Sequence, residues 1–191
     1  MTHYDPDDEV FFSVDIETAG PYPGRYSLLT IGACLVSDPK ETFYVEMRPA
    51  SGDSTLQALE ITGLSLEALA ERGLEPAEAM RQFEEWVLAH TPDGSRPVFV
   101  SFNAVFDWMF INEYFHRYLG RNPFGHSALD MKALYMGLTG ATWAETSMRY
   151  VAARYLEGRE LTHNSLNDAC DQAELLRRML DEARTHGWGW L

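Results

Sequence analysis

A buried strand that ends in two acidic residues is the feature that most constrains this chain. Residues 10–17 form a run of apolar and β-branched residues that carries Asp15 and Glu17 at its end, and Gly20 and Pro21 then signal a turn. Because side chains alternate between the two faces of a strand, both carboxylates point to the same side. Neighbouring carboxylates repel each other in a buried site. A hard dication such as Mg²⁺ or Mn²⁺ would remove that repulsion, whereas an ordinary strand end would expose both acids to solvent.

The bulk composition favours one domain with a full-sized core. The chain has 191 residues, of which 46% are hydrophobic. It contains no apolar run of about 18 residues or more, and its acidic start lacks a secretory signal, so we expect a cytoplasmic protein without a membrane span. We expect a short flexible lead at 1–8, a single domain at 9–185 and an aromatic C-terminal tail at 186–191.

The net charge of −14 argues against a protein that grips long nucleic acid through a broad basic surface. It is compatible with a nuclease in which bound metals and a confined pocket hold the substrate, because metal ligands account for part of the negative charge. Short or single-stranded ends fit such a pocket better than duplex tracts. Arg25, Lys132 and Arg149 are candidates to contact a phosphate, although a solvated surface is the ordinary place for each.

The order of the expected elements indicates a mixed α/β sheet flanked by helices. Residues 128–137 fit either a short strand or a helix. Apolar patterns and turn residues predict strands at 10–17, 27–36, 42–47 and 97–101, and helices at 66–72, 75–90, 104–119, 144–156 and 165–185.

A second acidic position follows the strand at 97–101. Asn103 is a candidate N-cap, which places Asp107 in the first turn of the next helix. Asp107 could simply complement the helix dipole. The same position, just after the carboxyl end of a strand, is also where open α/β sheets build their sites.

A third group lies at 162–169, where His163 precedes Asp168 by five residues. One interpretation is a capping box from Ser165 to Asp168 with His163 as an ordinary loop residue. The other places Asp168 on the metals and His163 beside them, because a neutral imidazole is suited to taking a proton from water near neutral pH. Leu166, Ala169, Ala173 and Leu176 form an apolar stripe on the helix that follows.

Taken together, the D-I-E-T strand, the F-N-A-x-F-D helix start and the H-x-x-L-x-D-A helix resemble the three motifs of the DnaQ-like, or DEDDh, 3′–5′ exonucleases. The resemblance spans nearly the whole chain. His163 corresponds to the His subtype; the other subtype has a Tyr where this chain has Asn164. The chain departs from the family in carrying Ser165 where Ala is frequent, which is expected to alter only local hydrogen bonding.

The resemblance implies a ribonuclease H-like fold, with a central five-stranded mixed sheet flanked by helices. It implies an enzyme that releases 5′-mononucleotides from the 3′ ends of short or single-stranded DNA or RNA, with His163 as general base. Members of the family often form dimers, so a homodimer is an expectation. The resemblance implies two Mg²⁺ or Mn²⁺ ions held by Asp15, Glu17, Asp107 and Asp168.

The resemblance also implies contacts to the terminal nucleotide. Glu17 would contact the 3′-hydroxyl, and the backbone near Thr18 and Ala19 would line the terminal sugar. Phe102, Phe106 and Trp108 are candidates to stack on bases, with core packing as the alternative for Phe102 and Phe106, and Asn103 belongs to the same substrate-binding set.

Three alternatives stay open. The same chemistry would serve an oligoribonuclease-type enzyme that trims RNA, since no residue decides between the two sugars. A nuclease fold that only binds is disfavoured because all four acids and the histidine are present. A hydrolase of small phosphate esters would act on a nucleotide monoester but not on an oligonucleotide end.

Overall fold

Five strands form one mixed sheet in the order β3-β2-β1-β4-β5 in the computed structural model. Strands β1 (Glu9–Thr18), β2 (Leu28–Leu35) and β3 (Thr42–Glu46) pair antiparallel. Strands β4 (Arg96–Ser101) and β5 (Ala128–Asp130) extend the other side of β1 in parallel. The expected five-stranded mixed sheet is confirmed.

The structure describes residues 8–159, 162–185 and 187. The expected lead at 1–8 and tail at 186–191 therefore fall, except for residues 8 and 187, outside the described residues. Among the described residues, no helix has the length and apolar character needed to cross a membrane.

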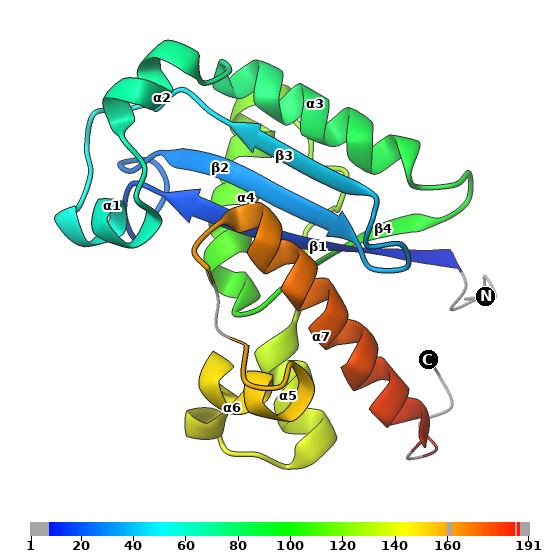
Figure 1. The fold of residues 1–191 in the computed structure, drawn as a ribbon. Coiled ribbons are helices and arrows are strands. Elements are labelled where there is room, and N and C mark those ends of the chain that lie inside the picture. The colour runs from blue at the N-terminus through cyan, green and yellow to red at the C-terminus, as the bar shows by residue number, and fades with distance from the viewer. Residues whose placement is uncertain (1–7, 160–161, 186, 188–191) are drawn as a thin grey trace.

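Helices cover both faces of the sheet (Figure 1). Helices α3 (Pro76–Ala89) and α4 (Ala104–Leu119) pack on one face, where Phe12, Val14 and Ile16 of β1 point. Helix α7 (Ser165–Thr185) crosses the other face, joined by α5 (Met131–Thr139) and α6 (Met148–Tyr155). Because β1 alternates, Asp15 and Glu17 lie on the α7 face.

The segment at 128–137, which fitted either a strand or a helix, contains both: β5 ends at Asp130 and α5 begins at Met131. Helix α2 (Leu66–Arg72) lies where expected, and the 3₁₀ helix η2 (Trp143–Thr146) precedes α6. Helix α1 (Leu56–Thr62) was not expected. It is short and has no fully buried residue, so its apolar pattern in the sequence is weak.

Gly32 allows α7 to approach the sheet closely. It pairs with Asp15 in the β1–β2 ladder, and a Cβ built on it would lie 2.2 Å from the carbonyl carbon of Ser165. Beside this contact, the hydroxyls of Thr30 and Ser165 share a hydrogen bond of 2.9 Å. The serine that departs from the family pattern therefore ties the start of α7 to β2.

Candidate active site

The acids of the first motif lie at the end of β1. The ladder to β2 is irregular between Glu17 and Thr18, where the register shifts. Such bulges redirect side chains at the edges of sites. Glu17 is 9% exposed and Asp15 is partly buried, so both carboxylates lie in a shielded recess below α7.

Asp107 enters the recess from the first turn of α4, as expected. It is buried, and its Oδ2 accepts a hydrogen bond of 2.6 Å from the hydroxyl of Ser101. Asn103 occupies the N-cap position, but its backbone is left-handed (φ 67°) and its side chain makes no capping bond. Asp130 at the end of β5 supplies the bond instead, its Oδ2 accepting from the N–H of Ala104 at 2.7 Å.

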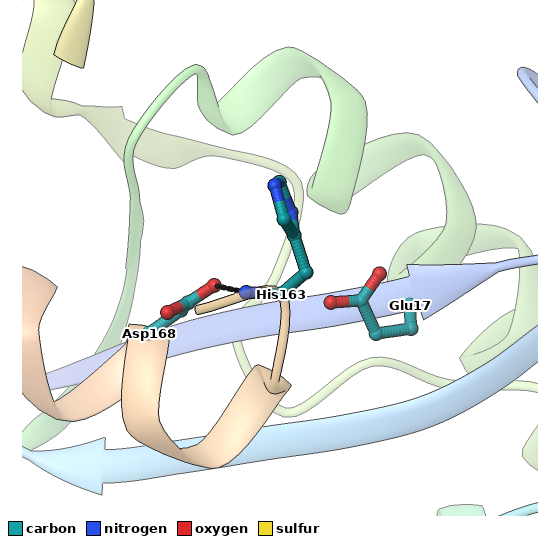
Figure 2. Close-up of side chains that lie close together, drawn as sticks. All are labelled: Glu17, His163 and Asp168. Atoms are coloured by element: carbon teal, nitrogen blue, oxygen red, sulfur yellow. Dashed lines mark hydrogen bonds between the residues drawn. The ribbon is translucent and has the colours of Figure 1, made fainter. Parts of the chain in front are cut away.

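Asp168 and His163 complete the group from the start of α7 (Figure 2). Asp168 is buried and accepts bonds from the backbone N–H groups of Thr162 (2.8 Å) and His163 (2.9 Å). The capping box from Ser165 to Asp168 is not formed: the side chain of Asn164 accepts from the N–H of Asn167, and Asp168 bonds to the preceding loop. These bonds hold His163 in a left-handed conformation (φ 54°) with an exposed side chain.

Burial, with added repulsion between neighbouring acids, raises the pKa of three of the carboxylates. Burial, followed by the charges of Asp168 and Asp107, raises the pKa of Glu17 to about 8. Burial also raises the pKa of Asp107 to about 7, against the opposing hydrogen bond from Ser101. The pKa of Asp15 is raised well above its ordinary value by burial and by the charges of Asp107, Glu17 and Asp168. The group therefore concentrates negative charge in a site of low polarity.

This donor set fits a divalent cation. One ligand atom each from Glu17, His163 and Asp168 lies within 4.8 Å of the others. Carboxylate oxygens are the ligands that Mg²⁺ and Mn²⁺ prefer, and a bound cation would favour the ionised form of these carboxylates against the burial that raises their pKa values. Divalent metal use is what the resemblance in the sequence implies, and the residues present are compatible with it.

A cleft of about 460 Å³ opens above these groups. All five proposed site residues line it: Asp15, Glu17, Asp107, His163 and Asp168. Its opposite wall comes from α1 through residues that include Gln57 and Ile61. The helix that was not expected from the sequence is therefore part of the site.

The residues expected to bind substrate are divided by the structure. Thr18, Phe102, Asn103 and Phe106 line the cleft. Ala19 is fully buried, and its N–H and carbonyl are bonded to Ser27 and Thr55, so the structure does not bring it to the surface of the cleft.

Gln172 is a buried polar residue of the site that the sequence did not reveal. Its Nε2 donates to Asp15 Oδ1 at 2.7 Å, and its Oε1 accepts from the N–H of Phe102 at 2.9 Å. The backbone N–H can only donate, so it fixes which end of the amide faces Asp15. In the sequence, Gln172 lies three residues after Ala169 and four before Leu176, so a polar residue beside the apolar stripe is the only signal that could have drawn attention to it, and that signal does not reveal its partner.

Known proteins resemble this chain in sequence and in fold. The chain matches no family model. It is 48% identical to the 3′–5′ DNA exonuclease Cap18 of Escherichia coli over 171 residues, which cover 90% of this chain and 91% of the relative.

Solved structures share the fold at low sequence identity. The nuclease domain of 3′hExo, a DEDDh family member bound to rAMP, aligns with a TM-score of 0.73 and 15% identity over 95% of this chain and 94% of that one. E. coli ExoI in complex with single-stranded DNA aligns with a TM-score of 0.64 and 21% identity over 92% of this chain, which spans only 41% of that longer protein. With the three motifs gathered at one cleft, these relationships establish that the chain belongs to the DEDDh family of 3′–5′ exonucleases.

Proposed function

We propose that this exonuclease is metal-dependent and removes 5′-mononucleotides from the 3′ end of single-stranded DNA. The observation that carries the proposal is the convergence of four carboxylates and one histidine on one cleft. DNA is favoured because the relative with 48% identity is a DNA exonuclease.

Asp15, Glu17, Asp107 and Asp168 are proposed to hold two Mg²⁺ or Mn²⁺ ions. When bound, the ions supply Lewis-acid stabilisation of the charge that develops on the attacking and leaving oxygens. The raised pKa values of Glu17 and Asp107 support this assignment, because these carboxylates need a cation to stay ionised near neutral pH.

His163 is proposed to take the proton from the attacking water. The water oxygen bonds to phosphorus as the bond from phosphorus to the 3′-oxygen of the preceding nucleotide breaks, and that oxygen takes up a proton. The exposed side chain of His163, beside the buried acids, lies where a solvent molecule can reach both. Its backbone bond to Asp168 keeps it at the mouth of the cleft.

Gln172 is proposed as a positioning residue. It links β1, the turn before α4 and α7 through two short bonds, one to Asp15 and one to the backbone of Phe102. The amide N–H also favours the ionised form of Asp15. Ordering of ligands by such outer partners is typical of metal sites.

The cleft walls are proposed to hold the terminal nucleotide. Phe102 and Phe106 on one side and Ile61 on the other give apolar surfaces for a base, while the acids face the phosphate. Apolar and aromatic side chains accept any base, because every base has a flat face.

The test is digestion of 5′-labelled single-stranded DNA and RNA of the same sequence, with Mg²⁺, with Mn²⁺ and with EDTA. We expect a ladder that shortens from the 3′ end of DNA, is absent in EDTA and is lost in Asp15→Asn. Asp93→Asn, at an exposed turn, is the matched control and should keep wild-type activity. A ladder on RNA alone would replace the DNA assignment with the RNA-trimming one, and full activity in EDTA would overturn the metal dependence.

A further inference from the structure

Most positive charge in this protein is neutralised by neighbouring carboxylates. Of the 15 Lys and Arg residues, the arginines at positions 25, 48, 72, 81, 117, 121, 154, 159, 178 and 184 form ion pairs with Asp or Glu. Arg25, one of three candidates for phosphate contact, is thereby paired with Asp53. A polyanionic substrate of a chain with net charge −14 needs cations that are not already paired.

The other two candidates, Lys132 and Arg149, have no carboxylate partner among the described residues. Both belong to the segment that contains α5, η2 and α6, which we call the α5–α6 lobe (residues 131–155). Lys40 and Arg177 likewise show no such partner within the described ranges, but they lie elsewhere. Lys40 is in the β2–β3 turn, and Arg177 lines a separate cavity with Glu9 at the start of β1, the opposite end of that strand from the cleft.

The lobe combines buried apolar residues that pack toward α7 with exposed aromatic side chains. Buried residues such as Tyr135, Val151 and Tyr155 join the cluster that includes α7. In contrast, Trp143 is 58% exposed and Tyr150 is 51% exposed. The ammonium of Lys132 lies 4.2 Å from the centre of the Trp143 ring. An aromatic surface and an unpaired cation are thus held together by a cation–π contact.

The lobe is tied to the cleft at both of its chain ends. The chain enters it after Asp130, which bonds to Ala104 beside the cleft residues Phe102 and Asn103. After α6 the chain leads to the loop that carries His163. Since β5 is parallel to β4, and β4 to β1, the lobe starts at the same edge of the sheet where β1 presents its acids.

We propose that the α5–α6 lobe binds the single-stranded part of the substrate that lies 5′ of the nucleotide in the cleft. Trp143 stacks on a base, while Lys132 and Arg149 contact phosphates. This inference rests on the proposed function, because the strand is the substrate of the same site. It identifies the substrate class as a single strand longer than the terminal nucleotides that the cleft itself can hold.

Charge and chemistry favour this occupant over an apolar partner. Base stacking on an aromatic side chain tolerates any sequence, and Lys or Arg beside it neutralises the backbone; together they form the usual platform for single strands. Lys132 and Arg149 give the lobe two positive charges for the phosphates of a strand, in a protein whose net charge is −14.

The first test compares a DNA trinucleotide with a DNA oligomer of about 20 nucleotides, using initial rates of 3′-nucleotide release. Trp143→Ala should raise KM for the long oligomer by about 5- to 150-fold and leave kcat and the trinucleotide KM unchanged. Trp143→Phe keeps a stacking surface, so its KM for the long oligomer should stay close to that of the wild type. Lys40→Ala, which removes the same charge from the β2–β3 turn, is the matched control and should behave as wild type.

The second test measures binding of a 5′-fluorescein-labelled (dT) oligomer of the same length by anisotropy in EDTA at several salt concentrations. Lys132→Ala and Arg149→Ala should each reduce the slope of log K against log salt by about 0.7. This readout does not depend on turnover, so it distinguishes failure of the platform from failure of the proposed exonuclease activity.

Two results would overturn the proposal. In the first, Trp143→Ala changes KM for the trinucleotide and the long oligomer equally, or changes neither, and Lys132→Ala and Arg149→Ala leave the salt slope unaltered. In the second, the wild type is a dimer, Trp143→Ala is a monomer, and KM for the long oligomer is the same in both. That second result would assign the surface to contact between two copies of the chain.

Discussion

His163 combines an exposed imidazole with a left-handed backbone, and this combination suggests the substitution that tests its role. Asn tolerates the left-handed region better than other side chains, so His163→Asn removes the proposed base while keeping the loop. We expect kcat to fall by about 10²- to 10⁴-fold, the usual contribution of a general base, with little change in KM. Initial rates on single-stranded DNA, together with the midpoint of thermal unfolding, measure both effects.

His126 provides the matched control for this prediction. It is also exposed, but it lines a different cavity with Arg96 and Phe124. His126→Asn should therefore keep full activity. Wild-type kcat in His163→Asn would show that the proton is taken by another group.

Gln172 is the residue whose effect should depend on metal concentration. Gln172→Met keeps the length of the side chain but removes the bonds to Asp15 and to the N–H of Phe102. We expect the Mg²⁺ concentration for half-maximal activity to rise, or activity at fixed Mg²⁺ to fall, by about 10- to 100-fold. A merely structural role would lower the thermal midpoint but leave the Mg²⁺ requirement of the folded enzyme unchanged.

Gln172→Glu tests the bond to Asp15 separately from the bond to Phe102. A carboxylate at this position still accepts from the N–H of Phe102 but faces Asp15 with a like charge. It should therefore need more Mg²⁺ than the wild type. Gln82→Met, which removes a bond to Glu78 on α3, is the control and should keep the wild-type requirement.

At the scale of elements, the contact between β2 and α7 positions the third motif. Because a Cβ at position 32 would meet the backbone of Ser165 at 2.2 Å, Gly32→Ala must separate the strand from the helix. We expect a loss of about 1–3 kcal/mol in the free energy of unfolding, with a parallel loss of activity as Asp168 and His163 move. Urea denaturation and initial rates measure the two.

Gly52→Ala is the control, since nothing lies within 4 Å of a Cβ built there. Its stability should change by no more than about 0.5 kcal/mol. If Gly32→Ala were as stable and active as this control, the close approach of α7 would not be needed to form the site.

The elements that could be predicted from the sequence are those with a strong apolar pattern. The period-two pattern of β1 placed Asp15 and Glu17 on one face, and the long helices α3, α4 and α7 end within a few residues of their expected bounds. Helix α1 was missed because it is short and none of its side chains is fully buried, so its apolar pattern is weak.

The bonds within the site were less predictable than its members. The position of Asn103 at the start of α4 was expected, but the capping oxygen comes from Asp130, on a strand 27 residues further along the chain. Asp168 bonds to the preceding loop and not to Ser165. Gln172 lies 157 residues from its partner Asp15, and a glutamine within a helix carries no local signal of such a bond.

At the scale of the whole molecule, buried acidic groups change the stability of the fold with pH in two opposite directions. Glu84 is buried but paired with Arg121, which lowers its pKa, so its contribution to stability is present above its ordinary pKa and is lost in acid. Asp15, Glu17 and Asp107 have raised pKa values because they are buried and no Lys or Arg pairs with them among the described residues. These three acids should therefore make the metal-free protein less stable as pH rises toward neutrality.

The sign of this dependence follows from proton binding. The pKa of Glu17 is about 8 in the folded chain and 4.5 ordinarily, so between these values the folded state binds more protons than the unfolded state and stability falls as pH rises. In EDTA, with about 0.5 M KCl to screen surface repulsion, we expect the thermal midpoint to fall from about pH 5 to about pH 8. Mg²⁺ should raise the midpoint most at the alkaline end, because the ligands must be ionised to bind it. Glu17→Gln should flatten the EDTA profile. A midpoint that rises with pH in EDTA would contradict the shared burial of these carboxylates, since solvated acids would have no reason to hold their protons in the folded chain.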